Sequence, residues 1–208
     1  MHRLFIAAAL FLIALSALAA EISKQFVKAQ LAHGASIDIP RSWQIMRGNE
    51  SIAIESTVGA AIDLTGNAKV TEGTELLLIS IFPDPGLYAG VTVTSTAIPN
   101  ASRSSVGTLT DAQVKAGESA IRQGIVAMLS RLGERVSGWT PLEKVSLGGR
   151  IVLHISYVRS SEVGDRRVQM YKIFGSGRIY DLALSTSLAH ENTNQIILSR
   201  IATSFTVQ

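Results

Sequence analysis

The sequence predicts an α+β fold, in which an antiparallel sheet is flanked by a long central helix and a C-terminal helix. Three observations support this prediction. Strand-like segments fill the first half of the chain, one long amphipathic helix follows them, and an antiparallel meander then leads into a second amphipathic segment. Runs of strands with separated helices are typical of α+β proteins, whose helices pack on an antiparallel sheet.

The N-terminus has the layout of a secretory signal peptide over residues 1–20. A short cationic start, His2 and Arg3, precedes an apolar run from Leu4 to Leu15, and small residues follow. This order of charge, apolar run and small-residue end is typical of segments that a signal peptidase removes.

Cleavage is expected after Ala19 or Ala20 and leaves a single mature domain over residues 21–208. We therefore predict an exported protein of the bacterial periplasm. The alternative is a retained N-terminal anchor that faces the periplasm. A spanning helix needs about 20 apolar residues, and the apolar run here is shorter unless the alanines that follow are counted. No later segment is apolar enough to span a bilayer.

The composition narrows the possible functions. The chain has no cysteine, which excludes disulfides and thiolate metal sites and suits a periplasmic protein better than a small disulfide-rich scaffold. The formal net charge is only +3, and no basic run marks a nucleic-acid footprint. No histidine has a partner at metal-ligand spacing. We expect no cofactor, no metal, no nucleic-acid partner, and a monomer or weak dimer.

The first strands are predicted close to the mature N-terminus. Two of them lie within Gln25–Ile39 around a turn at His33-Gly34. Pro40 ends the second strand, because proline donates no hydrogen bond to a ladder. Trp43 is predicted to cover that end of the core.

Three further strands precede the long helix. They are predicted at Ile52–Val58, Glu75–Phe82 and Val91–Ile98, with a loop at Gly59–Gly73. The segment Glu75–Phe82 contains a nearly continuous apolar run, which favours a strand covered on both faces.

The strongest helix signal begins at Thr110. Thr110 and Gln113 have the spacing of a capping box, which satisfies free N–H groups of the first turn. The apolar stripe that follows is about 100° wide and consists of Val114, Ile121, Ile125, Met128, Leu129 and Leu132. Glu118 falls inside the stripe, and a pair with Arg122 one turn later explains it better than a catalytic role. The helix is expected to end near Gly133–Gly138.

Four strands and a final helix are predicted after this point. The strands span Thr140–Leu147, Arg150–Val158, Arg166–Phe174 and Arg178–Thr186, joined by Gly148-Gly149, the loop Arg159–Asp165 and Gly175-Ser176-Gly177. The final helix starts near Asn192 and carries Ile197, Leu198, Ile201 and Phe205 on one face. Glycine turns between strands predict antiparallel hairpins.

Both ends of the chain resemble the PsbP/DcrB-like superfamily of small exported or organellar domains. Ile37–Pro40 followed by Trp43 is similar to that group's strand, Pro, x, x, Trp opening. Arg178–Leu182 and Ile201–Phe205 are similar to its last strand and its Ile, x, x, Ser, Phe helix end. The resemblance implies an α/β/α sandwich without a shared catalytic centre, and hence a binding or accessory module.

Side-chain alternation divides the meander into an apolar and a polar face. The apolar face is predicted to hold Ile151, Leu153, Ile155 and Tyr157 on the first strand, Val168, Met170 and Phe174 on the second, and Tyr180, Leu182 and Leu184 on the third. This assignment pairs Tyr157 with Val168 and closes the second hairpin with Phe174 opposite Arg178.

The polar face then carries a row of three side chains, His154, Tyr171 and Asp181. One interpretation is cross-strand hydrogen bonding on a solvated or helix-covered sheet. The other is a ligand-binding floor, in which Tyr171 is the stacking surface and His154 and Asp181 are polar handles. The same register puts Lys172 on the apolar face beside Tyr180, so either the lysine extends past the sheet's edge or a bulge shifts the pairing.

These observations predict a non-catalytic exported accessory or binding module whose partner is a protein, a peptide or another envelope component. Two alternatives stay open. One is an envelope hydrolase that uses His154 and Asp181, and the other is a structural subunit of a larger envelope assembly. The sequence has no GxSxG nucleophile motif, and its glycine pairs lie between strands rather than ahead of a helix, so no phosphate cradle is predicted.

Overall fold

The computed structural model describes residues 25–47, 74–84, 87–99, 101–102, 105–161 and 164–207. The predicted signal peptide, the predicted strand Ile52–Val58 and the predicted loop Gly59–Gly73 lie outside these ranges.

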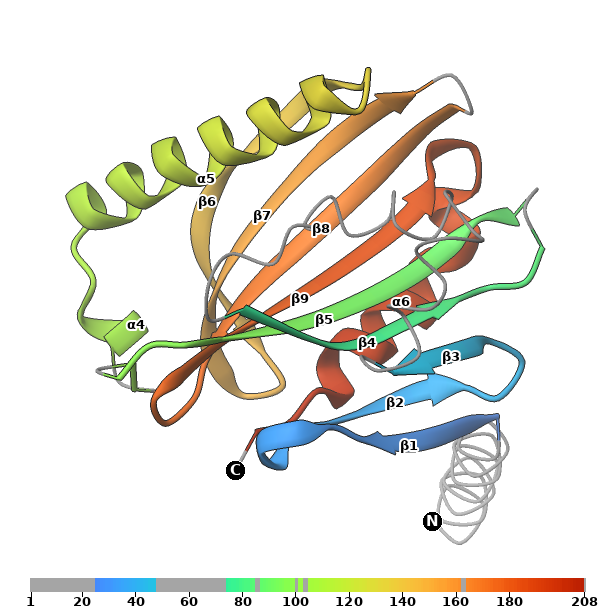
Figure 1. Ribbon diagram of the computed structural model, residues 1–208, viewed down its shortest axis with the longest axis horizontal. Coiled ribbons are helices and arrows are strands. Elements are labelled where there is room, and N and C mark those ends of the chain that lie inside the picture. The colour runs from blue at the N-terminus through green and yellow to red at the C-terminus, as the bar shows by residue number, and fades with distance from the viewer. Residues whose placement is uncertain are drawn as a thin grey trace, which may run out of the picture.

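A seven-stranded antiparallel sheet dominates the described part of the chain (Figure 1). In spatial order its strands are β3 (Gln44–Arg47), β4 (Thr74–Ile81), β5 (Ala89–Ala97), β9 (Arg178–Ser187), β8 (Gly164–Phe174), β7 (Arg150–Ser161) and β6 (Arg135–Leu147). A separate hairpin is formed by β1 (Phe26–Gln30) and β2 (Ser36–Pro40). The helices are α4 (Ser105–Thr108), α5 (Asp111–Arg131) and α6 (Glu191–Ser204), with 3-10 turns η1 (Ala32–Gly34) and η3 (Leu188–His190). The predicted α+β class is confirmed.

The predicted loop Arg159–Asp165 is wrong. Strand β7 continues to Ser161 and β8 already begins at Gly164. Arg159 opposes Arg166 and Ser160 opposes Asp165 in the ladder between them. The stretch lacks the apolar alternation that predicts a strand. Its strands are stabilised instead by pairing with each other and by the burial of Arg159.

The β1–β2 hairpin has the predicted turn at His33-Gly34. Both residues have left-handed backbone angles, with φ 58° for His33 and 70° for Gly34. A non-glycine residue is uncommon there, and His33 is held by two contacts. Its Nε2 lies 2.7 Å from Glu75 Oε2, and Tyr180 Oη donates to its carbonyl oxygen at 3.2 Å. These contacts fasten the hairpin to the large sheet.

The two ends of the described chain meet beside β2. Ser36 forms a bridge with Thr206, and the Asp38 N–H donates to Ser204 Oγ at 2.9 Å. The rings of Tyr180 and Phe205 pack edge to face, 5.8 Å apart. The segments that carry the family resemblance therefore adjoin one another in space.

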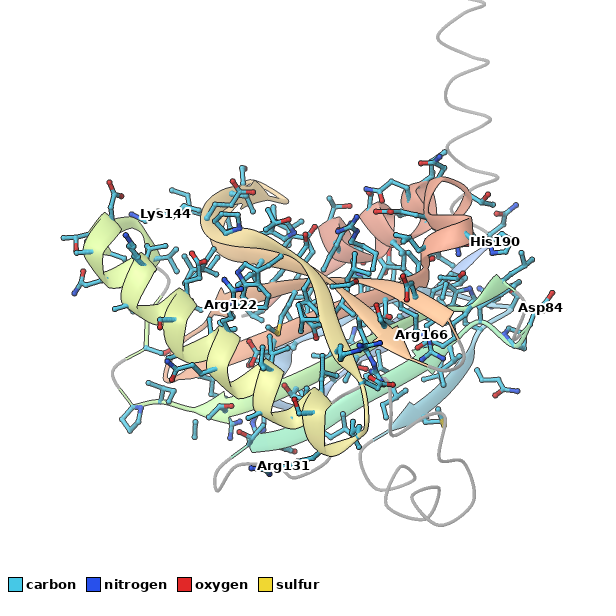
Figure 2. All side chains as sticks on the ribbon, turned by 90° about the horizontal axis from the view of Figure 1, so that it is seen from above. Asp84, Arg122, Arg131, Lys144, Arg166 and His190 are labelled. Atoms are coloured by element: carbon cyan, nitrogen blue, oxygen red, sulfur yellow. The ribbon has the colours of Figure 1, made fainter. Side chains whose placement is uncertain are left out.

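Each face of the large sheet has its own apolar core. Helix α6 and the β1–β2 hairpin cover one face, and α5 covers the β6–β8 part of the other (Figure 1). In Figure 2, Arg122 marks α5 and His190 marks η3, the turn that precedes α6. The first core includes Ile37, Ile39, Trp43, Leu182, Leu198 and Ile201. The second includes Ile125, Leu129, Leu153, Ile155, Tyr157 and Met170. Trp43 is 6% exposed and lies 6.3 Å from the Phe82 ring, which confirms its predicted place in the core.

Helix α5 begins with the predicted capping box. Thr110 Oγ1 accepts from the Gln113 N–H, and Gln113 Oε1 accepts from the Thr110 N–H. Ile125 and Leu129 are the buried centre of the predicted stripe. Leu132 is 48% exposed, because the helix ends at Arg131 and the chain turns away.

Glu118 does not form the predicted pair with Arg122 but binds the sheet instead. Its carboxylate accepts hydrogen bonds from Trp139 Nε1 at 3.3 Å and from the Leu142 N–H at 3.2 Å. The Arg122 guanidinium lies over the Trp139 ring, 5.5 Å from its centre, and Trp139 stacks on Tyr157. Both charged residues thus join α5 to the sheet edge at β6.

A buried ion pair joins β7 to the segment that follows α5. The side chains of Arg159 and Glu134 are only 4% and 5% exposed. Arg159 donates from Nη2 to Glu134 Oε1 at 2.8 Å and from Nε to Oε2. The Glu134 N–H also donates to the Leu129 carbonyl at 2.8 Å. Burial raises the pKa of the neighbouring Tyr157 hydroxyl to about 12, with Arg159 lowering it and Glu134 raising it.

Breaking this pair will destabilise the protein strongly. Arg159→Met leaves the Glu134 carboxylate buried without its guanidinium partner, and we expect the free energy of unfolding to fall by about 3–5 kcal/mol. The matched control is Arg167→Met, which breaks a more exposed pair with Glu191 and should lower it by about 0–1 kcal/mol. Urea denaturation measures both, and equal losses would contradict the assignment.

Candidate binding site

The predicted pairing of β7 with β8 is confirmed. Tyr157 lies opposite Val168, and His154 lies opposite Tyr171. The His154 and Tyr171 rings are 4.7 Å apart. Leu153, Ile155 and Tyr157 share one apolar face with Val168 and Met170, as predicted, and that face packs against α5.

The predicted pairing of β8 with β9 is wrong by one residue. The hairpin closes on the two residues Ser176 and Gly177, and the Gly175 N–H donates to the Arg178 carbonyl at 2.9 Å. Gly177 has φ 69°, which suits glycine in such a tight turn. Phe174 therefore lies opposite Ile179 rather than Arg178. A shift of one residue moves every side chain of β9 to the other face.

This shift removes Asp181 from the predicted row. Tyr171 lies opposite Leu182, and Asp181 lies opposite Lys172 on the α5 face of the sheet. Lys172 Nζ donates to Asp181 Oδ1 at 2.6 Å. The unexpected position of Lys172 is thus explained by turn length rather than by a bulge. Tyr180, Leu182 and Leu184, predicted on the face of Ile155, belong to the core under α6.

His154 and Tyr171 remain together on the α6 face. Tyr171 Oη donates to Gln169 Oε1 at 3.1 Å, and His154 Nδ1 lies 3.5 Å from Glu143 Oε1. Burial raises the pKa of the Tyr171 hydroxyl, and the His154 side chain is only 16% exposed. Cross-strand packing accounts for these contacts, and a ligand role for His154, Tyr171 and Asp181 stays a prediction.

A gap between β7 and β8 is a better candidate for a binding site than the face that carries His154 and Tyr171. The ladder between these strands runs only as far as Leu153 and Lys172. Beyond that rung, Ile151 still pairs with β6, and Phe174 still pairs with β9. The two strands therefore part before either of them ends.

Hydrogen-bond alternation orients the backbone at this gap. Arg150 pairs with Leu147 across the two-residue turn Gly148-Gly149, so its N–H and C=O point to β6. The N–H and C=O of the next residue, Ile151, then point to the opposite side, toward β8. Gly175 bonds to β9 through its N–H, so the N–H and C=O of Phe174 point toward β7. Both strands present backbone polar groups to the same space.

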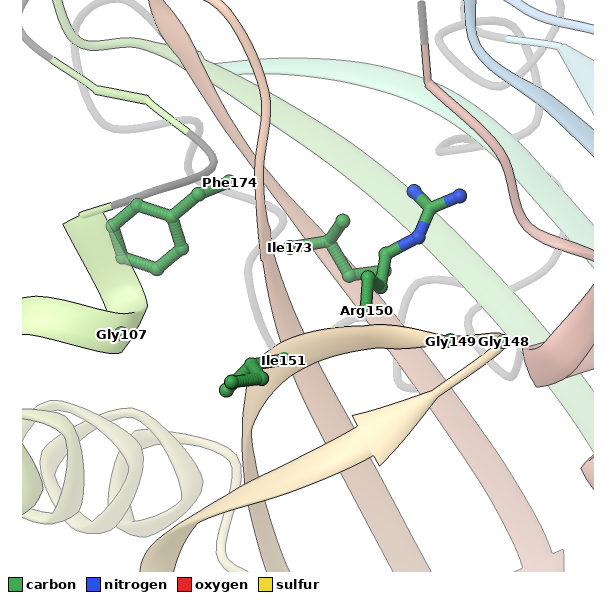
Figure 3. A pocket seen from close by; sticks show the side chains of 7 residues that line it. All are labelled: Gly107, Gly148, Gly149, Arg150, Ile151, Ile173 and Phe174. Carbon is green, nitrogen blue, oxygen red and sulfur yellow. The ribbon is translucent and has the colours of Figure 1, made fainter.

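A pocket of about 470 Å³ occupies the end of this gap (Figure 3). Among the described residues it is lined by Gly107, Gly148, Gly149, Arg150, Ile151, Ile173 and Phe174. Ile151 is 54% exposed although it faces the α5 side. Alternation puts Ile151 and Phe174 on the α5 side of the gap and Arg150 and Ile173 on the α6 side. We call these lining residues the strand-gap pocket.

The strands part because their two hairpin tips are held by different neighbours. A Cβ added to Gly148, which has φ 56°, would lie 3.0 Å from the Thr203 carbonyl oxygen, so the β6–β7 tip packs on the end of α6. The β8–β9 tip is tied to the chain after β5. Gly177 donates from its N–H to the Ala101 carbonyl and accepts from the Ile98 N–H, both at 2.9 Å. Figure 1 shows the two tips diverging.

Helix α4 closes one side of the pocket at Gly107 (Figure 3). Val106 is fully buried in the core under α5 and fixes the helix in place. Lys144 on β6 donates from Nζ to the carbonyls of Leu109, at 2.5 Å, and Gly107, at 3.4 Å. The wall formed by α4 is therefore fastened from both sides.

The described ranges hold neither a metal-binding cluster nor a helix that could span a membrane. They contain no group of three or more His, Asp or Glu side chains that could hold a metal ion. No helix within them is long and apolar enough to cross a membrane.

Solved structures share this fold. The solution structure of cyanobacterial PsbP (CyanoP) from Synechocystis sp. PCC 6803 has a TM-score of 0.58 and 15% identity, covering 88% of this chain and 93% of that chain. The chain therefore has a PsbP-like fold, as the resemblance implied. The match to the crystal structure of LpqN, involved in cell envelope biogenesis of Mycobacterium tuberculosis, covers 88% of this chain and 90% of that chain at 14% identity, with a TM-score of only 0.41. No family model and no curated protein matches the sequence.

The corrected register predicts which pairs of side chains interact. A double-mutant cycle of Lys172→Ala with Asp181→Ala should give a coupling of about 1 kcal/mol, because the two charges are in contact and partly buried. The control cycle of Tyr171→Phe with Asp181→Ala should be additive within about 0.5 kcal/mol, because the side chains lie on opposite faces. Urea denaturation gives both values. A larger coupling in the control cycle would restore the His–Tyr–Asp row.

Proposed function

We propose that the protein is an exported accessory module of the bacterial cell envelope, with residues 21–208 as its mature domain. Its function is to bind a partner through the strand-gap pocket, without catalysis. The observation that carries this proposal is the early end of the β7–β8 ladder, which leaves an exposed apolar side chain and backbone polar groups around one cavity.

The chemistry of the pocket suits binding. Ligand sites combine apolar walls with a few polar groups that fix orientation. Here Ile151 and Phe174 supply apolar surface, Ile173 lines the pocket but is only 1% exposed, and Arg150 supplies a charge. The described lining residues include no hydroxyl, imidazole or carboxylate side chain, so they supply no nucleophile and no general base.

The hydrolase alternative finds no support in the geometry of the meander. A general base and the residue that orients it must be within hydrogen-bond reach of each other. His154 faces the α6 side, whereas Asp181 faces the α5 side and bonds to Lys172. A structural subunit of a larger assembly would be covered by its partners over more of its surface than the pocket alone. Crosslinking at positions inside and outside the pocket distinguishes the two possibilities.

The proposed export relies on the N-terminal sequence. The charged start, apolar run and small-residue end of residues 1–20 support a cleaved signal, and the absence of cysteine suits a periplasmic protein. The PsbP-like fold is compatible with an accessory module and adds no partner of its own.

Site-specific photo-crosslinking in the producing cell tests the proposal. A photoreactive amino acid at Ile151 should give an adduct with an envelope component, because that side chain lines the pocket and is exposed. The matched control is Ile196 on α6, which is 80% exposed and outside the pocket. Mass spectrometry should find Ala20 or Glu21 at the mature N-terminus. An unprocessed cytosolic chain without an Ile151 adduct would contradict the proposal, and strong adducts at both positions would favour the structural subunit.

A further inference from the structure

The strand-gap pocket has features that define the class of its ligand. Resting on the proposed binding function, we infer that the pocket receives the C-terminal end of an extended peptide. The ligand's main chain bonds to the backbone of Ile151 and Phe174, its last side chains pack on the apolar wall, and its terminal carboxylate meets Arg150.

The backbone indicates a ligand that carries amide groups. The N–H and C=O of Ile151 and of Phe174 point into the gap from opposite strands. Strand edges of this kind bind extended chains through main-chain hydrogen bonds, and pockets for alternate side chains then give specificity. A purely hydrocarbon ligand would leave these groups without partners, which is unfavourable once water is excluded.

The side chains on the α5 side indicate that the ligand has an apolar part. Ile151 is 54% exposed, although the neighbouring residue on the same face, Leu153, is only 6% exposed. The Phe174 ring lies beside α4 at Gly107 (Figure 3). A ligand side chain placed between Ile151 and Phe174 would continue the core under α5, and its burial would be favourable in proportion to the apolar area covered.

The charge of the pocket indicates the free carboxylate. Arg150 is the charged member of the described lining residues, and none of them is acidic. Figure 3 shows its side chain extending away from Ile151 on the side where Ile173 lies. A guanidinium has five N–H donors and a permanent positive charge, so Arg150 can bind a carboxylate in addition to the contacts that it makes within the protein. The pocket volume of about 470 Å³ is within the range of small ligand sites, about 300–1,000 Å³, so it fits a few terminal residues rather than a long strand.

Two peptide pools test this inference on the processed protein. One is a randomised pentapeptide pool with a free C-terminal carboxylate, and the other is the same pool with an amidated C-terminus. We expect retention of the carboxylate pool, at least tenfold weaker binding of the amidated pool, and NMR shifts at the amides of Ile151 and Phe174. Dodecanoate serves as a probe for a carboxylate without amide groups and should bind more weakly than the retained peptides.

Variants supply the second arm of this experiment. Ile151→Glu places a negative charge in the pocket at an exposed position and should abolish retention, whereas Ile196→Glu, on the outer surface of α6, should leave it unchanged. Arg150→Gln should weaken binding of the carboxylate pool about tenfold and leave the amidated pool unaffected.

Three results would overturn the inference. These are equal binding of both pools, preference for dodecanoate, or failure of the carboxylate pool to shift the amides of Ile151 and Phe174. A photo-crosslinked partner at Ile151 combined with any of these results would leave the proposed function standing and reject only the peptide ligand. Loss of both the crosslink and the processed N-terminus would reject the proposed function itself.

Discussion

The candidate site depends on how the β6–β7 hairpin meets the neighbouring β8–β9 hairpin, where β7 pairs with β8. Its first residues pair with β6, and the shared tip of that hairpin packs against the end of α6 at Gly148. The neighbouring β8 shares its tip with β9, and Gly177 binds this tip to Ala101. Strand β7 follows the first tip toward α6, and β8 follows the second tip toward Ala101. The ladder between β7 and β8 therefore ends early. The pocket, its exposed isoleucine and its inward backbone groups all follow from that break.

The opposite end of the same strands is closed. There β7 and β8 stay paired to Ser161 and Gly164, and the buried Arg159–Glu134 pair holds the segment after α5 against β7. Apolar cores cover both faces of this closed part of the sheet. A site carried on strands in this way is positioned more firmly than one built on loops. The gap therefore adjoins a part of the sheet that is fully paired and packed on both faces.

Local signals in the sequence predicted much of the fold. The capping box at Thr110, the turn at His33-Gly34 and the burial of Trp43 each have a signal in a short stretch of sequence, and each was predicted correctly. The position of Asp181 depended on whether the β8–β9 turn uses two or three residues, a choice that the glycines alone do not decide. The gap near Ile151 lay beyond sequence reasoning, because it arises from contacts of the two hairpin tips with distant segments.

Amide hydrogen exchange in the region of the gap tests the central claim most directly. The amides of Leu153 and Lys172 form the last rung of the ladder and should be protected, because strand hydrogen bonds must open before exchange. The amides of Ile151 and Phe174 point into the gap and should exchange much faster in the protein without ligand. Equal protection at all four positions would mean that the strands stay paired to their ends, and the pocket and the binding function assigned to it would lose their structural basis.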